Sequence, residues 1–249
     1  MGLYAIGDLH LHFASELRAK EQLSDPVWKN HEARFKLNCQ NLLRESDTLM
    51  LLGDHSWGKN MEQCERDLDY IMALPGKKVL LRGNHDMFWD AKKTDALNGR
   101  FAGRLFFLQN NYCPYGEVAL VGTKGFTFEG PFYIGRDGRV IGWDTEAAER
   151  AEKLVAREAE RLRISFEAAK RDGFKRFIVF LHYPPTSILE NRSAFTDLAE
   201  EYGAEQVFYA HCHDATRFHD SLEGRVRGVR YTLVSGDCLN WNPVRVRLK

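Results

Sequence analysis

Residues 48–54 read TLMLLGD, a run of apolar, strand-forming residues that ends abruptly in Gly-Asp. The same pattern occurs twice more: Leu3–Gly7 is followed by Asp8, and Val79–Leu81 leads into RGNHD at residues 82–86. Short apolar runs bounded by Gly and Asp are typical of buried strands. The intervals carry helical spacing over Trp28–Glu45 and Glu62–Leu74. Strand, helix, strand, helix, strand with short connections predicts an α/β fold with a parallel sheet.

The second half of the chain continues in strands and helices. Asp144 is the expected N-cap of a long helix over 144–172, and a shorter helix is predicted over Phe195–Tyr202. Residues 122–142 are expected to form a long surface loop, and NNYCPYG at 110–116 a turn. The remaining predicted strands are Arg104–Leu108, Glu117–Val121, Arg176–Leu181 and Gln206–Ala210, followed by a terminal antiparallel ribbon of Val226–Val234 and Val244–Leu248. No linker or repeat interrupts residues 1–249, so we expect one domain.

Composition narrows the class of protein. The 249 residues are 44% hydrophobic and 28% charged, ordinary values for a soluble globular protein. The 35 basic and 35 acidic residues cancel, so no global field attracts long nucleic acid or an anionic membrane. The N-terminus lacks a signal-peptide pattern, and no apolar run could span a bilayer. The 5 cysteines include no C-x-x-C motif, which indicates free thiols and a cytoplasmic location.

Polar side chains follow the end of each of five predicted strands. Because parallel strands end at one edge of a sheet, where α/β folds place their ligand sites, we expect these side chains to converge. In an extended chain, residues two apart face the same way, so the members of each D-x-H or H-x-H pair should point together. Asp54 is the middle carboxylate and the natural bridge between two cations. The converging residues are Asp8, His10, Asp54, Asn84, His85, His182, His211 and His213.

Residues 207–214, VFYAHCHD, permit three interpretations: a three-ligand zinc clip, a redox thiol in a polar turn, or part of a larger site. Taken singly, Asp54 would be a turn residue or N-cap, and His182 a hydrogen-bonded, partly buried imidazole. Turn chemistry prefers Ser, Gly and Pro over His, so the whole set favours a metal or catalytic site. Cys212 lies between the two histidines and should point away from the metals, and we predict that it is not a ligand.

The ordered motifs resemble those of the calcineurin-like metallophosphoesterases. They are D-x-H at 8–10, GD at 53–54, GNHD at 83–86, His182, and H-x-H at 211–213. GTKGF at 122–126 and LHYPP at 181–185 are similar to a bacterial subgroup of predicted phosphohydrolases. The resemblance implies a four-layer α/β/β/α sandwich. Two sequence departures are Ala210, where Gly is common, and Trp57, where the protein-phosphatase branch has an Asp that orients the equivalent of His85.

The resemblance also implies a dinuclear site with Asp54 as the bridge. His85 would contact the phosphate or protonate the leaving oxygen, while a hydroxide that bridges the metals attacks phosphorus. Mixed nitrogen and oxygen ligands suit Mn²⁺, Fe or Zn²⁺ better than Mg²⁺ or Ca²⁺. The implied ligands are Asp8, His10, Asp54 and His213 for one metal, and Asp54, Asn84, His182 and His211 for the other.

Residues near these motifs have weaker assignments. Asp214 and Asp237 are candidate partners of histidine ligands, and His55 is a candidate pocket wall or a support behind the ligands rather than a ligand. Lys124 is one candidate phosphate contact, and His31 is expected to lie on the surface.

The predicted function is hydrolysis of a small phosphomonoester or phosphodiester, including nucleotide-derived ones. The alternative is a catalytically dormant scaffold of the same fold that binds a protein partner, which the complete set of eight site residues disfavours. The zero net charge disfavours a nuclease, although a short oligonucleotide substrate stays open. No membrane partner is expected, and the sequence specifies no oligomeric state.

Overall fold

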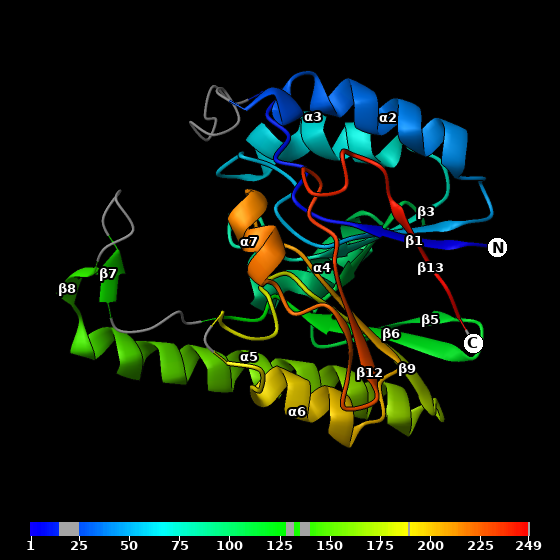
Figure 1. Cartoon of the computed structure of the whole chain (residues 1–249). Helices are drawn as coiled ribbons and strands as arrows, with labels where there is room; N and C mark the ends of the chain where they lie inside the picture. Colours follow the sequence, from blue (N-terminus) through cyan, green and yellow to red (C-terminus); the bar gives the residue numbers. More distant parts are fainter. Residues whose placement is uncertain (15–24, 128–131, 135–139, 189, 249) are drawn as a thin grey trace.

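Two β-sheets lie face to face between two layers of helices (Figure 1). The computed structural model describes residues 1–14, 25–127, 132–134, 140–188 and 190–248. Helices α2 (His31–Leu42) and α3 (Met61–Met72) cover the outer face of the first sheet. Helices α5 (Thr145–Arg171) and α6 (Ala194–Glu201) cover the outer face of the second. This arrangement confirms the predicted α/β/β/α sandwich.

The first sheet contains the three strands predicted from the N-terminal third of the chain. In the described residues its order is β13-β1-β2-β3-β4, and β1 to β4 are parallel whereas β13 is antiparallel to β1. The parallel strands therefore all end at one edge. Their bounds are Leu3–Ile6 (β1), Thr48–Leu51 (β2), Lys77–Leu81 (β3) and Leu105–Leu108 (β4), with β13 at Val244–Val246.

The second sheet has the order β11-β12-β10-β9-β6-β5 in the described chain. Strands β6, β9, β10 and β12 are parallel to one another. The two edge strands are antiparallel to their neighbours: β5 pairs with β6, and β11 pairs with β12. The bounds are Tyr112–Tyr115 (β5), Val118–Thr123 (β6), Arg176–Leu181 (β9), Gln206–Tyr209 (β10), Gly224–Val226 (β11) and Val229–Leu233 (β12).

The predicted terminal antiparallel ribbon is wrong. Strands β12 and β13 belong to different sheets: β12 pairs with β10 and β11, and β13 pairs with β1. The chain crosses between the sheets where Gly7 N donates to Val234 O at 2.8 Å. Strand β13 covers the edge of the first sheet beside β1, and Val246 thereby enters the core between the sheets. That gain in burial is not available to an isolated ribbon.

The segment predicted as a turn at 110–116 contains β5. Pro114 obscured it, but β5 is an edge strand, where a residue without an N–H is tolerated. Part of the predicted loop over 122–142 forms the hairpin of β7 (Phe132–Ile134) and β8 (Val140–Trp143). The remaining short elements are η1 (Pro26–Trp28), η2 (Ala91–Lys93), α4 (Thr94–Arg100) and α7 (Ala215–Asp220).

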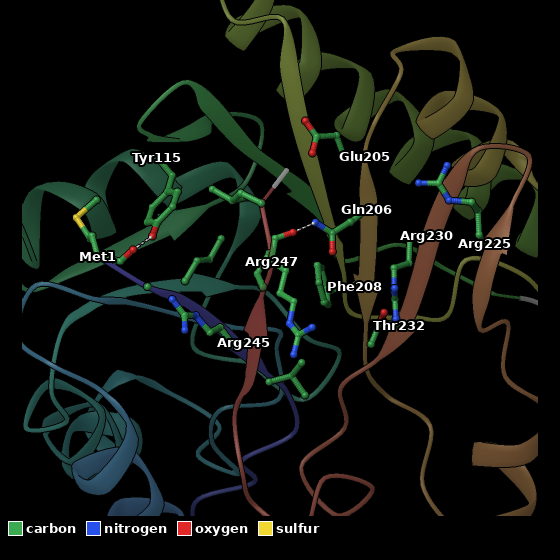
Figure 2. Close-up of a pocket in the computed structure, with 15 residues that line it drawn as sticks. Met1, Tyr115, Glu205, Gln206, Phe208, Arg225, Arg230, Thr232, Arg245 and Arg247 are labelled. Atoms are coloured by element: carbon green, nitrogen blue, oxygen red, sulfur yellow. Dashed lines mark hydrogen bonds between the residues drawn. The ribbon is translucent and has the colours of Figure 1, made fainter.

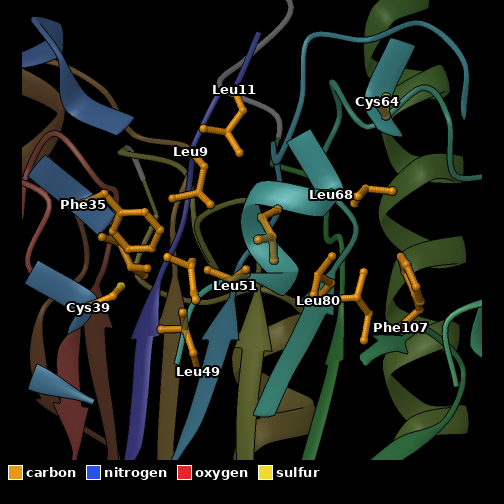
Figure 3. Packing of buried hydrophobic residues seen from close by; sticks show 14 of the residues in the cluster. Leu9, Leu11, Phe35, Cys39, Leu49, Leu51, Cys64, Leu68, Leu80 and Phe107 are labelled. Carbon is orange, nitrogen blue, oxygen red and sulfur yellow. The ribbon is translucent and has the colours of Figure 1, made fainter. Parts of the chain in front are cut away.

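Apolar side chains of the described residues form three buried clusters, one between each pair of adjacent layers. Figure 3 shows the cluster beneath α2 and α3, where Phe35 and Leu68 pack on strand residues such as Leu49. The middle cluster joins the sheets and includes Phe180 and Phe208. The third lies between the second sheet and α5 and α6. No helix in the described ranges is long and apolar enough to cross a membrane.

Candidate metal centre

The eight candidate residues lie on loops that leave the carboxyl ends of β1, β2, β3, β9 and β10. Backbone hydrogen bonds join neighbouring loops: Asp8 N donates to Gly53 O at 3.0 Å, and His10 N donates to Asp54 O at 2.8 Å. These bonds hold the first two loops in fixed register, so the side chains that they carry have a common frame.

One group of ligand atoms comes from Asp8, His10 and His213, and these atoms all lie within 4.8 Å of one another. Asp8 and His10 are buried, with 0% and 4% exposure. His213 Nδ1 lies 3.0 Å from Asp237 Oδ2, which leaves Nε2 of this imidazole to face the group. Asp237 thus fixes the orientation and the tautomer of the His213 ring. This contact was predicted, since Asp237 was one of two candidate partners of histidine ligands.

A second group comes from Asp54, His182 and His211, again with ligand atoms within 4.8 Å. His182 is fully buried, and its Nδ1 lies 2.8 Å from Leu52 O, so Nδ1 is the donor and Nε2 carries the lone pair. That Nε2 faces Asn84 Oδ1 at 2.7 Å. Two acceptors at this distance repel one another, and a cation between them would remove the repulsion.

Asp54 lies between the two groups. Its Oδ2 is 3.7 Å from His10 Nε2, 3.5 Å from His182 Nε2 and 3.9 Å from His85 Nε2. These separations exceed hydrogen-bond length, and they surround one carboxylate oxygen with imidazole nitrogens from three loops. The other oxygen, Oδ1, accepts a hydrogen bond from His85 N at 2.8 Å, which orients the carboxylate.

The protonation equilibria of these side chains fit a cationic occupant. Burial raises the pKa of Asp8 to about 7, and burial together with the nearby charge of Asp86 raises that of Asp54 to about 7. Burial lowers the pKa of His182 to about 3 and that of His211 to about 2, so both imidazoles are neutral and offer lone pairs. Buried carboxylates with neutral imidazoles form a donor set that lacks positive charge, and metal ions would supply it.

The behaviour of His213 differs from that of the other two histidines. Burial lowers its pKa, but the charge of Asp8 and the hydrogen bond to Asp237 outweigh burial and raise the pKa to about 9. A cation bound at this ring would therefore displace a proton. Asp8 Oδ1 is buried without a hydrogen-bond partner, as expected of an atom shaped to bind an ion.

The backbone reaches this geometry by strain rather than by extended alternation. Asp8, His10, Asp54 and His211 have positive φ of 60°, 43°, 51° and 68°. The pairs do converge, but left-handed turns and not a period of two direct them. Such conformations cost free energy and are concentrated at functional sites.

Two glycines permit the close approach of these loops. A Cβ on Gly83 would lie 2.1 Å from Asp54 Oδ1, and one on Gly53 would lie 2.6 Å from His182 Nδ1. Gly53 also has a φ of +90°, which disfavours other residues. Both motifs therefore require glycine beside the ligand.

Sequence reasoning assigned no role to Asp86, although it lies in the quoted GNHD motif. This carboxylate is fully buried and accepts three backbone N–H groups, from Asp54 at 3.0 Å, His55 at 2.8 Å and Gly83 at 2.7 Å. It joins the loops after β2 and β3 and so positions Asp54. The signal in the sequence was the second acidic residue that ends the GNHD motif.

The side chain of His85 is 40% accessible, compared with 34% for His213 and 1% for Asp54. The ring of Trp57 lies 4.3 Å from that of His85 and 4.8 Å from that of His10. An aromatic ring therefore contacts His85 at the position where the protein-phosphatase branch has an aspartate. The imidazole of His85 remains open to a ligand at the mouth of the site.

Other assignments near the site have mixed outcomes. His31 is not on the surface: it is 3% exposed, and its ring nitrogens face Trp28 O and Leu9 O. It was missed because it lies at the start of a helix whose charged residues suggested exposure. His55 is fully buried against Leu81 O, and its backbone N–H donates to Asp86, so it supports the ligand loops from behind. Asp214 was predicted to support a histidine ligand, but its side chain forms the N-cap of α7.

Lys124 and Cys212 both follow strands of the second sheet, after β6 and β10. Lys124 lies 5.2 Å over the ring of Tyr183, which in turn contacts His211 at 4.1 Å. Tyr183 was not singled out from the sequence. Cys212 is 2% exposed and packs in the apolar cluster under α5 and α6, so it points away from the ligand groups. The methyl group of Ala210 is buried between the sheets.

This fold and this donor set define a metal-dependent hydrolase of the α/β/β/α sandwich type. The family model for calcineurin-like phosphoesterases matches residues 1–215, and the chain belongs to that family.

The chain is also similar to individual proteins. It is 30% identical over 97 residues to the uncharacterized protein MJ1445 of Methanocaldococcus jannaschii, a match that covers 39% of this chain and 53% of that protein. The chain thus spans about half the length of the curated relative that it matches.

Two solved structures cover nearly the whole chain. The phosphopantetheinyl hydrolase of Mycobacterium tuberculosis is 16% identical, with a TM-score of 0.57 over 100% of this chain and 96% of its own. The protein of unknown function AQ665 of Aquifex aeolicus is 17% identical, with a TM-score of 0.43 over 98% and 95%. The likeness to the first supports the fold alone.

Proposed function

We propose that residues 1–249 form one metallophosphoesterase domain that hydrolyses small phosphomonoesters or phosphodiesters, including nucleotide-derived ones, at a dinuclear metal centre. The observation that supports this most strongly is the pair of ligand groups on either side of Asp54. When bound, two such ions would neutralise phosphoryl oxygens and lower the pKa of a water nucleophile.

The protein's own residues divide the work. Asp54 would bridge the ions and is catalytic in that sense. His85 would contact the phosphate and hold the proton that the leaving oxygen takes, since 40% of its side chain is accessible and its Nε2 lies beside the proposed ligands, 3.9 Å from Asp54 Oδ2. The proposed ligands are Asp8, His10, Asp54 and His213 for one ion and Asp54, Asn84, His182 and His211 for the other.

The donor atoms of the site indicate which metals it would bind, and the free cysteines indicate the cellular compartment. Imidazole, carboxylate and amide donors favour Mn²⁺, Fe or Zn²⁺, with Mn²⁺ our first choice. The substrate is a small phosphorylated molecule rather than long nucleic acid or a membrane surface. The cysteines of the described chain are all free, which supports a cytoplasmic location.

The test measures bound metal and turnover of chromogenic phosphate mono- and diesters by the full-length protein loaded with each ion. Asp54→Asn should deplete both metals and remove most of the activity. Asp90→Asn is the matched control, because Asp90 makes an exposed cap of η2. Wild-type metal stoichiometry in Asp54→Asn would refute the bridging assignment.

A second variant separates chemistry from metal binding. His85→Asn should keep near-normal metal content and lower turnover by roughly 10²–10⁴-fold, the usual contribution of a general acid. Unchanged turnover would remove His85 from the mechanism. A protein that bound no transition metal and turned over no ester would instead be the dormant scaffold.

A further inference from the structure

A second cavity lies at the opposite end of the strands from the metal centre (Figure 2). Its volume is about 1100 Å³, and it is lined by Leu3 and Gln206, the first residues of β1 and β10. Asp8 follows Leu3 by one strand length, so the two sites are roughly 15 Å apart along β1. The cavity is therefore separate from the ligand groups.

Four arginines line this cavity and come from both sheets. Arg225 and Arg230 lie on β11 and β12, Arg245 lies on β13, and Arg247 follows it. All four are exposed. Within the described ranges, none of the four forms an ion pair with a carboxylate, and the lining carboxylate Glu205 is bound by Arg176 at 2.6 Å.

Two of these guanidinium groups are placed against one another by the sheet itself. Arg225 and Arg230 are direct partners in the antiparallel pair of β11 and β12. Side chains in such positions are close neighbours, and like charges there destabilise the pair. By contrast Arg227, on the turn between these strands, is paired with Glu200. Among the described residues, the arginines on the cavity side of this hairpin therefore lack the carboxylate partner that Arg227 has.

The direction of Arg230 follows from its neighbours. Val229 and Tyr231 pack under α5 and α6, so Arg230 and Thr232 lie on the opposite face, toward the cavity. Phe208 is 2% exposed and forms an apolar part of the wall. Gln206 Nε2 donates to Arg247 O at 2.9 Å, which ties the end of the chain to β10 (Figure 2).

We propose that this cavity binds a polyphosphate anion, a chain of two or three phosphates that is either free or attached to a nucleoside. A guanidinium donates paired N–H groups to phosphate oxygens, and four of them match the charge of a triphosphate. Thr232 adds a hydroxyl group, and the volume is sufficient for a nucleotide. An inorganic or nucleoside source shares this chemistry. The inference does not depend on the proposed phosphoesterase activity.

The test is calorimetric titration of the full-length protein with tripolyphosphate and, separately, with ATP, with and without added Mn²⁺. Arg225→Gln/Arg230→Gln should weaken binding on the order of tenfold for each arginine removed. Arg245→Gln/Arg247→Gln removes the two arginines of the other sheet and should weaken binding by a similar factor. It keeps the proposal testable if the first double variant does not fold. Arg104→Gln/Arg171→Gln removes two exposed charges elsewhere and should leave the affinity within about twofold.

Asp54→Asn provides the control for the metal centre and should retain binding. Equal affinity for the two probes would indicate recognition of the phosphate chain alone, and tighter ATP binding would indicate a nucleoside subsite; both support the proposal. The proposal would be overturned if Asp54→Asn abolished binding while the arginine variants retained it. It would also be overturned if Arg104→Gln/Arg171→Gln weakened binding as much as the cavity variants, or if the wild-type protein bound neither probe. Tighter binding of a polyglutamate peptide than of either probe would also overturn it, in favour of an acidic polypeptide.

Discussion

Asp86 offers the sharpest test of how the centre is held together, because its carboxylate has no proposed contact with metal or substrate. Its Oδ2 accepts from Asp54 N and Gly83 N, and its Oδ1 accepts from His55 N. In Asp86→Asn the amide oxygen can keep the first two bonds. The amide NH₂ group then faces the N–H of His55, so one acceptor is lost and two donors are opposed.

The expected loss in the free energy of unfolding follows from these three contacts. A hydrogen bond to a charged group contributes about 1.5–3 kcal/mol, and a buried unsatisfied donor costs a similar amount. Loss of one bond with weakening of the other two predicts a destabilisation of about 2–4 kcal/mol. This loss is on the order of one quarter of the free energy of unfolding of a typical folded domain, which is about 5–15 kcal/mol.

Urea unfolding monitored by circular dichroism measures this difference. Asp90→Asn is the control, since it makes the same chemical change at an exposed cap, where about 1 kcal/mol or less is expected. A change in Asp86→Asn below about 0.5 kcal/mol would show that the three N–H groups find other partners and would refute the reasoning.

Three further outcomes are expected. Metal binding at pH 7 should release protons, because the pKa of His213 is about 9 and those of Asp8 and Asp54 are about 7 in the metal-free protein. The affinity should fall as pH drops below 9, where His213 is protonated, and fall more steeply below 7, where both carboxylates are also protonated; titration in buffers of different ionisation enthalpy measures the proton release. An affinity that is constant from pH 5 to pH 8, as a rough range around these values, would contradict the assignment. Cys212→Ser should keep metal content and activity, as elemental analysis and turnover will show, and loss of either would make Cys212 part of the site. Gly83→Ala should lower metal content, because its Cβ would meet Asp54 Oδ1 at 2.1 Å, whereas Gly99→Ala, with nothing within 4 Å, should not; equal metal content in both would contradict the packing argument.

The part of the fold that sequence predicted well is the part governed by local pattern. Apolar runs such as Leu49–Leu52 cannot be exposed, and the helical spacing between them leaves parallel pairing as the solution. Strands that end together then bring distant polar residues to one edge. The convergence of these residues therefore followed from their places in the sequence, whereas their division into two ligand groups came from the family resemblance.

Local pattern failed where pairing depended on which edges were still open. Strand β13 resembles a ribbon partner of β12, but it joins β1 because the first sheet has a free edge there. Pro114 marks a turn by composition, yet it lies in an edge strand. His31 has charged neighbours along α2, but its own side chain is buried against Leu9 and Trp28. Each outcome was decided by contacts distant in sequence.

The sequence by itself determined the class of protein and the identity of the converging residues, since residue type and strand order are encoded along the chain. Only the tertiary structure decided how those residues are directed and supported. The left-handed backbone at Asp54, the three bonds to Asp86 and the arginines that, in the described part of the chain, surround the cavity without carboxylate partners all depend on which loops and sheets meet. Packing of distant segments determines such features, because the free energy of a strained turn or a buried carboxylate is balanced by partners that no local segment contains.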